Sequence, residues 1–64
     1  KLTRREHDVL IAISEELTTQ EISEKLFISL PTVRTHIRHI YEKFHINSRM
    51  EAKDISLKYK VLED

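Results

Sequence analysis

Apolar residues recur at helical spacing in several stretches of this chain, and a start signal precedes each stretch. The pattern Ser/Thr-x-x-Glu occurs three times, at Thr3 and Glu6, Thr18 and Glu21, and Ser48 and Glu51. In such a capping box the hydroxyl accepts a hydrogen bond from the backbone N–H three residues on, and the glutamate accepts one from the N–H of the cap residue. The apolar positions that follow are Val9, Leu10, Ile13 and Leu17, then Ile22 and Leu26, then Ala52, Ile55, Tyr59 and Leu62.

A fourth start signal lies at Ser29, because Pro31 follows in the first helical turn, where its missing N–H has no helical partner to lose. No stretch shows the sustained alternation of a strand. The sequence therefore predicts an all-α fold, a compact four-helix domain over residues 1–64 with helices near 4–15, 19–26, 30–44 and 49–61.

The chain contains no glycine, although helices commonly end in a glycine with left-handed backbone geometry. We therefore expect Glu16, and either His45 or Asn47, to adopt that geometry at the helix junctions, with some strain at Glu16.

Only Phe27 and Ile28 separate the second predicted helix from the Ser29 cap of the third. Ile28 is expected to point inward and to fix the two helices at a steep angle. Two helices joined in this way form a helix-turn-helix, the motif that places its second helix in the major groove of DNA.

The third predicted helix has two different faces. An apolar stripe predicts its core side and consists of Val33, Ile37, Ile40 and Phe44, flanked by Leu30 and Tyr41. The opposite side carries Pro31, Arg34, Thr35 and Arg38, which we expect to contact bases. Arginine can donate two hydrogen bonds to guanine, and threonine offers a hydroxyl and a methyl group. Glu42 follows on the same side and would repel phosphates, so the helix is expected to leave the groove before it. A solvated outer face is the alternative interpretation.

Phosphate contacts are expected from donors that flank these positions. The N-terminus of the second helix supplies free N–H groups beside Thr18, Thr19 and Gln20. Further candidates along the third helix are Thr32, His39 and Lys43.

The charge of the chain is zero overall but unevenly distributed. Residues 1–28 carry a balance of −2, residues 29–49 a balance of +3, and residues 50–64 a balance of −1. Positive charge is thus concentrated around the third helix, as nucleic-acid binding requires. The chain has no cysteine, which is compatible with the cytoplasm, and no signal-peptide pattern or membrane-length apolar run. It starts without a methionine, so we expect a segment of a longer protein.

The fourth predicted helix has a second apolar face. Met50, Leu57 and Val61 lie opposite its core stripe, with Lys53 and Asp54 between them. A domain of this size has no further core for that face to contact. We expect it to form a homodimer interface, in which Lys53 and Asp54 pair across a two-fold axis; stray apolar residues at a frayed end are the alternative.

Other classes of function are less well supported. His36, His39, Glu42 and His45 recur every third residue, but the drift of three-residue steps around a helix prevents all four from binding one metal ion. No metal site and no cofactor are predicted. No nucleophile lies beside a base and an orienting carboxylate, so the chain is not expected to be an enzyme. A protein–protein interaction module without DNA binding stays open as the main rival.

Several short motifs in a fixed order make the chain similar to a known family. They are Leu2-Thr-Arg-Arg-Glu6, Val9-Leu10, Glu21-Ile22-Ser23, Leu26-Phe-Ile-Ser29, Thr32-Val-Arg-Thr-His36, Ile40-Tyr-Glu-Lys43 and Ser48-Arg-Met-Glu-Ala52. Together they resemble the LuxR/NarL/FixJ/GerE-type DNA-binding domain, over nearly the whole chain.

The resemblance implies a four-helix domain that binds bacterial promoter DNA as a dimer, with base contacts at Arg34, Thr35 and Arg38. It further implies the C-terminal output domain of a transcriptional or response regulator in a two-component system, behind a receiver or sensor domain. The chain departs from the pattern at Glu16 and His45, where glycine is usual. It also departs at Ser23, where alanine is usual, and at Lys53 and Asp54, where the fourth helix is often apolar.

Overall fold

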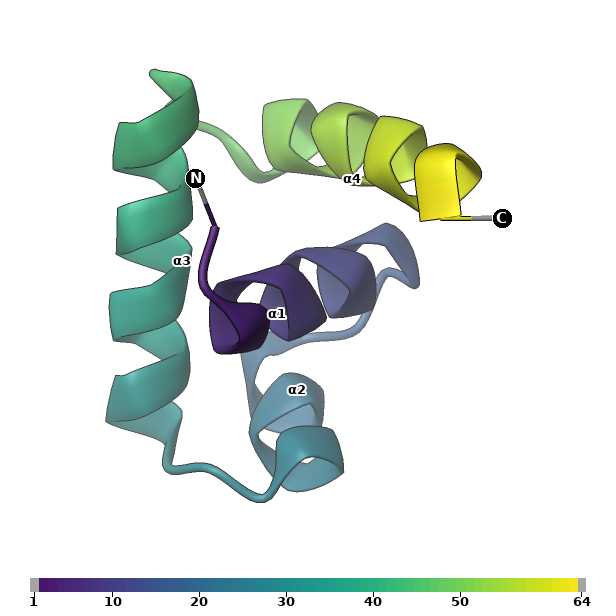
Figure 1. Cartoon of the computed structure of the whole chain (residues 1–64). Coiled ribbons are helices and arrows are strands. Elements are labelled where there is room, and N and C mark those ends of the chain that lie inside the picture. The colour runs from purple at the N-terminus through teal and green to yellow at the C-terminus, as the bar shows by residue number, and fades with distance from the viewer. Residues whose placement is uncertain (1, 64) are drawn as a thin grey trace.

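The computed structural model describes the backbone of residues 2–63 and the side chains of residues 2–59. Within this range the chain forms four helices and no strand: α1 (Arg4–Ser14), α2 (Thr19–Leu26), α3 (Leu30–Phe44) and α4 (Arg49–Glu63). Figure 1 shows α3 along one side of the molecule, with α4 near its C-terminal end, α2 near its N-terminal end and α1 between them. The predicted all-α, four-helix fold is confirmed. Helix α1 ends one residue earlier than predicted and α4 extends two residues farther.

The helix starts follow the sequence signals. Thr3 and Thr18 each form a complete capping box with the glutamate three residues on. Ser29 caps α3 by accepting a hydrogen bond from the backbone N–H of Thr32. Ser48 accepts one from the N–H of Glu51 at 3.2 Å. These bonds satisfy N–H groups that would otherwise lack a partner at the helix ends.

Three non-glycine residues hold left-handed backbone geometry at the helix ends: Glu16 (φ 62°), Phe27 (φ 57°) and His45 (φ 56°). At each junction the next residue donates its N–H to the carbonyl five positions back, as in a Schellman motif. The prediction for Glu16 is confirmed, and His45 rather than Asn47 serves the later junction. Phe27 was not expected, because its position within the short turn carries no glycine-like signal.

The core consists of fully or almost fully buried apolar side chains from all four helices: Val9, Leu10, Ala12, Ile13, Ile22, Val33, Ile40 and Ala52. The predicted apolar stripes of α1, α2 and α3 supply most of it. Ile37 and Phe44, predicted as core, are only partly buried and pack against it.

Helix α4 presents small residues to α1. Ser56 is fully buried beside Ala52, whereas the predicted core residues Ile55 and Tyr59 are partly buried. The hydroxyl of Ser56 donates to the carbonyl of Lys53 at 2.6 Å, which satisfies it without a tertiary partner. A polar residue therefore lies in the core at a position where the sequence pattern favoured only apolar ones.

Candidate nucleic-acid interface

The turn between α2 and α3 is fixed by two reciprocal hydrogen bonds between Ser23 and Ile28. The Ser23 hydroxyl donates to the carbonyl of Ile28 at 2.6 Å, and the N–H of Ile28 donates to the carbonyl of Ser23 at 3.2 Å. Ile28 packs against the core, as predicted. An alanine at position 23 could make only the backbone bond, so the serine adds a side-chain restraint on the angle at which α3 leaves the turn.

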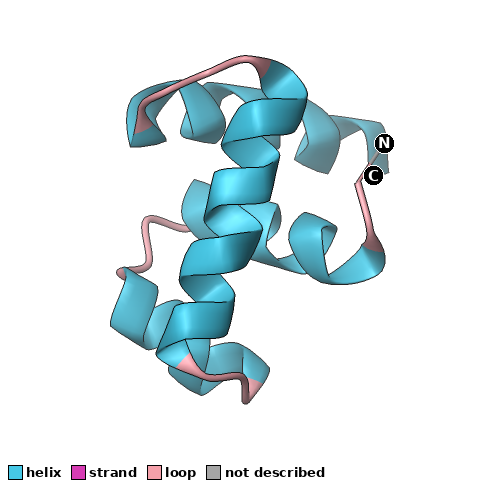
Figure 2. Ribbon diagram, turned by 90° about the vertical axis from the view of Figure 1, so that its left-hand side faces the viewer, coloured by secondary structure: helices cyan, strands magenta, loops and turns pink. Residues whose placement is uncertain are grey.

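The outward side of α3 is uncovered. Figure 2 shows this helix in front of the rest of the molecule along its whole length. Pro31, Arg34 and Arg38 are exposed on it, while Val33 and Ile40 on the opposite side are fully buried. The two faces assigned from helical spacing therefore coincide with the exposed and buried sides. We call the set of predicted base contacts, Pro31, Arg34, Thr35 and Arg38, the base-contact surface.

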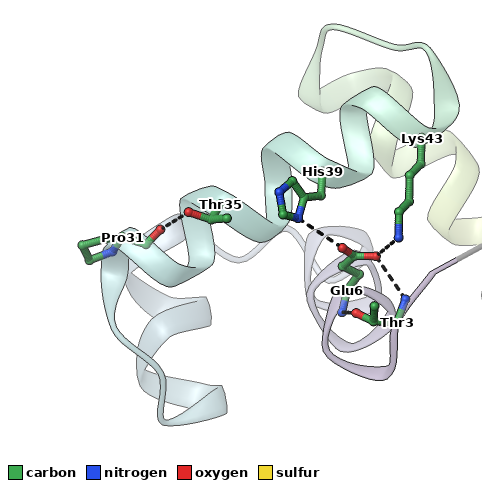
Figure 3. A network of polar contacts seen from close by, with 6 residues as sticks. All are labelled: Thr3, Glu6, Pro31, Thr35, His39 and Lys43. Atoms are coloured by element: carbon green, nitrogen blue, oxygen red, sulfur yellow. Dashed lines mark hydrogen bonds and ion pairs between the residues drawn. The ribbon is translucent and has the colours of Figure 1, made fainter.

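Within the base-contact surface, the threonine side chain is fixed by a hydrogen bond, whereas the two arginine side chains are free to bind a ligand. The Thr35 hydroxyl donates to the carbonyl of Pro31 at 3.0 Å, one turn back (Figure 3). This fixes the side chain but leaves the hydroxyl lone pairs and the methyl group for a ligand. No hydrogen bond or ion pair among the described residues engages Arg34 or Arg38. Two guanidinium groups one helical turn apart thus face solvent.

Farther along α3, two predicted phosphate contacts lie against a buried carboxylate. Glu6 of α1 is only 3% exposed. Its Oε1 lies 2.6 Å from Nζ of Lys43, and its Oε2 lies 3.4 Å from Nδ1 of His39 (Figure 3). The N–H of Thr3 also donates to Oε1 at 3.0 Å. Glu6 therefore both caps α1 and joins it to α3.

Charge explains why a carboxylate is stable at this depth. Burial by itself raises the pKa of Glu6, since it disfavours the charged form. The hydrogen bonds from Lys43, Thr3 and His39 and the positive charge of Lys43 outweigh burial, and together they lower the pKa from 4.5 to about 2. Glu6 is thus a carboxylate at neutral pH.

The capping-box pattern alone marks Glu6 as a capping residue and nothing more. One signal pointed further: Glu6 precedes Val9, Leu10 and Ile13 by three, four and seven positions, so it lies on the apolar stripe of α1. An acidic residue on a core-facing stripe requires a cationic partner. The identity of that partner, 37 positions away, could not be deduced from local spacing.

The predicted phosphate contacts at the start of α2 lie near an additional cation. Thr18 and Gln20 are exposed, and Thr19 is half-buried. The hydroxyl of Thr19 accepts a hydrogen bond from Nη1 of Arg49 at 3.4 Å, and Nη2 of the same arginine donates to the carbonyl of Leu17. No local pattern in the sequence predicts this contact, because Arg49 lies thirty positions from Thr19.

The remaining predicted phosphate contact, Thr32, lies at the start of α3. It is exposed, and its hydroxyl is 2.8 Å from that of Ser29. The structure thus places Thr32 beside the base-contact surface and the other candidates in two groups, one at the start of α2 and one around Glu6.

The three histidines in and directly after α3 lie in different environments. His39 faces Glu6, His45 is exposed at the helix end, and Nδ1 of His36 is buried without a hydrogen-bond partner among the described residues. No group of three potential metal ligands comes together in the part of the chain that the structure describes.

The second face of α4 is open. Met50 is 76% exposed and Leu57 is 45% exposed, and Asp54 beside them is exposed as well. Nζ of Lys53 lies 3.1 Å from Oε2 of Glu16 in the same chain. Lys53 therefore has a partner already, and a pair with Asp54 across a two-fold axis would have to compete with Glu16. Val61 lies outside the residues whose side chains are described.

A short α2, a fixed turn and an α3 with an exposed cationic outer side define a helix-turn-helix DNA-binding domain. Comparison with known proteins gives the family. Residues 1–56 match the family model described as bacterial regulatory proteins, luxR family. None of the helices in the described part of the chain is long and apolar enough to span a membrane.

Individual relatives agree with the family match. The chain is 45% identical over 51 residues to the transcriptional regulatory protein LiaR of Bacillus subtilis. The aligned residues make up 80% of this chain and 24% of LiaR. It is 39% identical over 62 residues to the oxygen regulatory protein NreC of Staphylococcus carnosus, covering 97% of this chain and 29% of NreC. A putative HTH-type transcriptional regulator of Mycobacterium tuberculosis is 42% identical over 53 residues, 83% of this chain and 6% of that protein.

This chain belongs to the luxR family of bacterial regulatory proteins and is a DNA-binding domain for transcription regulation. It spans less than a third of the length of each of these three relatives.

Proposed function

We propose that the chain recognises a specific double-stranded DNA site by placing the first two turns of α3 in the major groove. The observation that carries this proposal is the pair Arg34 and Arg38, exposed on the outer side of a helix whose inner side is locked in the core. A guanidinium in the groove donates two parallel hydrogen bonds to guanine, while Thr35 and Pro31 offer apolar contact to thymine methyl groups. The core keeps α3 rigid, so the four side chains are presented in one fixed register.

Contacts to the DNA backbone would set the orientation of α3. We assign them to Thr18, Thr19 and Gln20 at the N-terminus of α2, where the helix dipole favours an anion, and to Thr32 beside the base-contact surface. His39 and Lys43 complete the set. Because both contact Glu6, their contribution to phosphate binding is expected to be smaller than that of an unpaired cation.

A single short base-contact surface recognises few base pairs, so we propose that two copies bind two half-sites. The open face of α4 would pair the copies through Met50, Leu57 and Val61, with Lys53 and Asp54 pairing across the two-fold axis. In a two-fold arrangement each copy presents the same surface to the other. The exposure of Met50 and Leu57 supports this assignment, since large apolar side chains grouped on one helix face mark association sites.

The relatives are longer proteins whose names describe regulators. We therefore propose that this domain is the C-terminal DNA-binding part of a cytoplasmic regulator, without catalytic activity of its own, and that a receiver or sensor domain precedes it. In a two-component system phosphorylation of a receiver would change the availability of α3 or α4.

Salt dependence separates DNA binding from the rival, a protein-interaction module. Each phosphate that the protein neutralises releases counterions, so the logarithm of the affinity falls linearly with the logarithm of salt concentration, by about 0.9 per phosphate contact. We expect such a line when the chain is titrated with a mixed-sequence duplex at several salt concentrations. A flat response, or no binding at low salt, would favour the rival.

A further inference from the structure

Arg49 joins the first turn of α4 to the start of α2. Its guanidinium makes two hydrogen bonds: Nη1 donates to the hydroxyl of Thr19 at 3.4 Å, and Nη2 donates to the backbone carbonyl of Leu17. The two acceptors lie on either side of Thr18, the residue that caps α2. Arg49 therefore holds the segment whose N–H groups and hydroxyls are the proposed phosphate contacts of α2.

A second link from α4 reaches the same junction. Lys53, one turn after Arg49, lies 3.1 Å from the carboxylate of Glu16. Glu16 has the left-handed backbone that turns the chain from α1 towards α2. In a residue with a Cβ atom this geometry has a steric cost that glycine avoids, so the junction needs external contacts to stay in one conformation. The first two turns of α4 provide such contacts on both sides of Leu17.

We propose that Arg49 is a positioning residue for DNA binding, which fixes the N-terminal turn of α2 so that Thr18, Thr19 and Gln20 meet the DNA backbone. The inference rests on the proposed phosphate contacts of α2. It also makes α4, the proposed dimer helix, a direct support of the DNA-binding surface. The planar fork of arginine suits this role because it donates to two acceptors at fixed angles, whereas a lysine ammonium acts as a single flexible point charge.

Two roles of Arg49 predict different responses to salt. A direct phosphate contact by its guanidinium would release counterions, so its loss would reduce the salt slope by about 1. If Arg49 only positions uncharged N–H and hydroxyl groups, its loss would weaken DNA binding and leave the salt slope unchanged, because these groups carry no net charge. The lysine variant sharpens the contrast, since Arg49→Lys keeps the charge and loses the fork.

The test compares Arg49→Ala and Arg49→Lys of the 64-residue chain with the parent, on a mixed-sequence duplex over a range of salt concentrations. Arg5→Ala is the matched control, because Arg5 is an exposed arginine on α1 that pairs with Asp8 and lies outside the proposed interface. Thermal unfolding by circular dichroism is recorded for every variant. Thr19→Val serves as a second route to the same contact, since it removes the acceptor hydroxyl and keeps the shape of the side chain.

We expect both Arg49 variants to bind roughly three- to tenfold more weakly than the parent, the range given by the loss of one or two net hydrogen bonds, with an unchanged salt slope. Arg5→Ala should bind like the parent. Arg49→Ala should have a smaller effect in the Thr19→Val background than in the parent, because only its bond to the carbonyl of Leu17 is left to lose there. Parent-like affinity of Arg49→Lys, a slope reduced by about 1 in Arg49→Ala, or full additivity with Thr19→Val would each overturn the positioning role. Absence of salt-dependent binding by the parent would instead contradict the proposed function itself.

Discussion

Lys43 in the last turn of α3 forms a 2.6 Å ion pair with Glu6 in the first turn of α1. The carboxylate is buried, and His39 approaches it from one turn earlier on the same helix. This contact joins the C-terminal half of α3 to α1, while Pro31 and Arg34 in the N-terminal half are exposed to solvent. It therefore separates α3 into a part that anchors the helix and a part that carries the proposed base contacts.

The ion pair makes the stability of the fold depend on pH in the acid range. The pKa of Glu6 is lowered from 4.5 to about 2 in the folded chain, so its stabilising effect is complete above pH 4.5 and is lost as the pH falls towards 2. The linked change in the free energy of unfolding is up to about 3 kcal/mol. Urea unfolding of the parent and of Glu6→Gln measures it. The two proteins should differ at neutral pH and converge in acid; a difference that does not change with pH would contradict the assignment.

The same contact bears on the expected role of Lys43. If Lys43 also contacts phosphate, Lys43→Ala should weaken all duplex sequences alike and reduce the salt slope by up to about 1. Because removal of Lys43 leaves Glu6 without its main cation, Lys43→Ala should also destabilise the fold. Duplex titration at two salt concentrations, below the unfolding temperature of the variant, separates these effects. An unchanged slope would assign Lys43 to the ion pair alone.

The left-handed residue after α3 offers a way to stabilise the fold. His45 has a φ of 56°, a geometry that glycine adopts without the steric cost of a Cβ atom. His45→Gly should therefore raise the free energy of unfolding by about 1 kcal/mol. Asn47→Gly, two residues on and without that geometry, is the control and should stabilise nothing. Equal effects of the two substitutions in urea unfolding would show that backbone geometry at His45 is not the cause.

Self-association should depend on the open face of α4. Leu57→Glu places a charge where an apolar contact is proposed, so it should increase the monomer fraction in sedimentation equilibrium. Leu57→Met keeps the apolar character and should sediment like the parent. Identical monomer fractions in the parent and Leu57→Glu would rule out this helix face as the dimer interface.

Local signals were enough to predict the helices. Capping boxes such as Thr3 with Glu6 act within four residues, so the helix starts were predicted correctly. The spacing of apolar residues indicates which side of a helix is buried, so most core positions were correct as well. The face of α3 that carries Arg34 and Arg38 followed from the same spacing. The structure thus confirms which residues are available on the surface of the helix.

Features that depend on distant partners could not be predicted. Glu6 pairs with Lys43, 37 positions away, and Arg49 pairs with Thr19, 30 positions away. A single sequence does not indicate which residues so far apart come into contact. The burial of Ser56 depends on how closely α4 approaches α1. Phe27, 93% exposed in a left-handed conformation, lacks any local signal for that geometry, since glycine would be the usual choice.

Specific recognition by the base-contact surface is tested most directly by selection from a pool of random duplexes with the parent, Arg34→Ala and Arg38→Ala in parallel. We expect the parent to enrich a defined motif. Each arginine variant should lose preference at one guanine-containing position, at a cost of about 1–3 kcal/mol in affinity for the parent motif. If the parent enriches no motif, or if both variants enrich the same motif as strongly as the parent, recognition does not reside in Arg34 and Arg38.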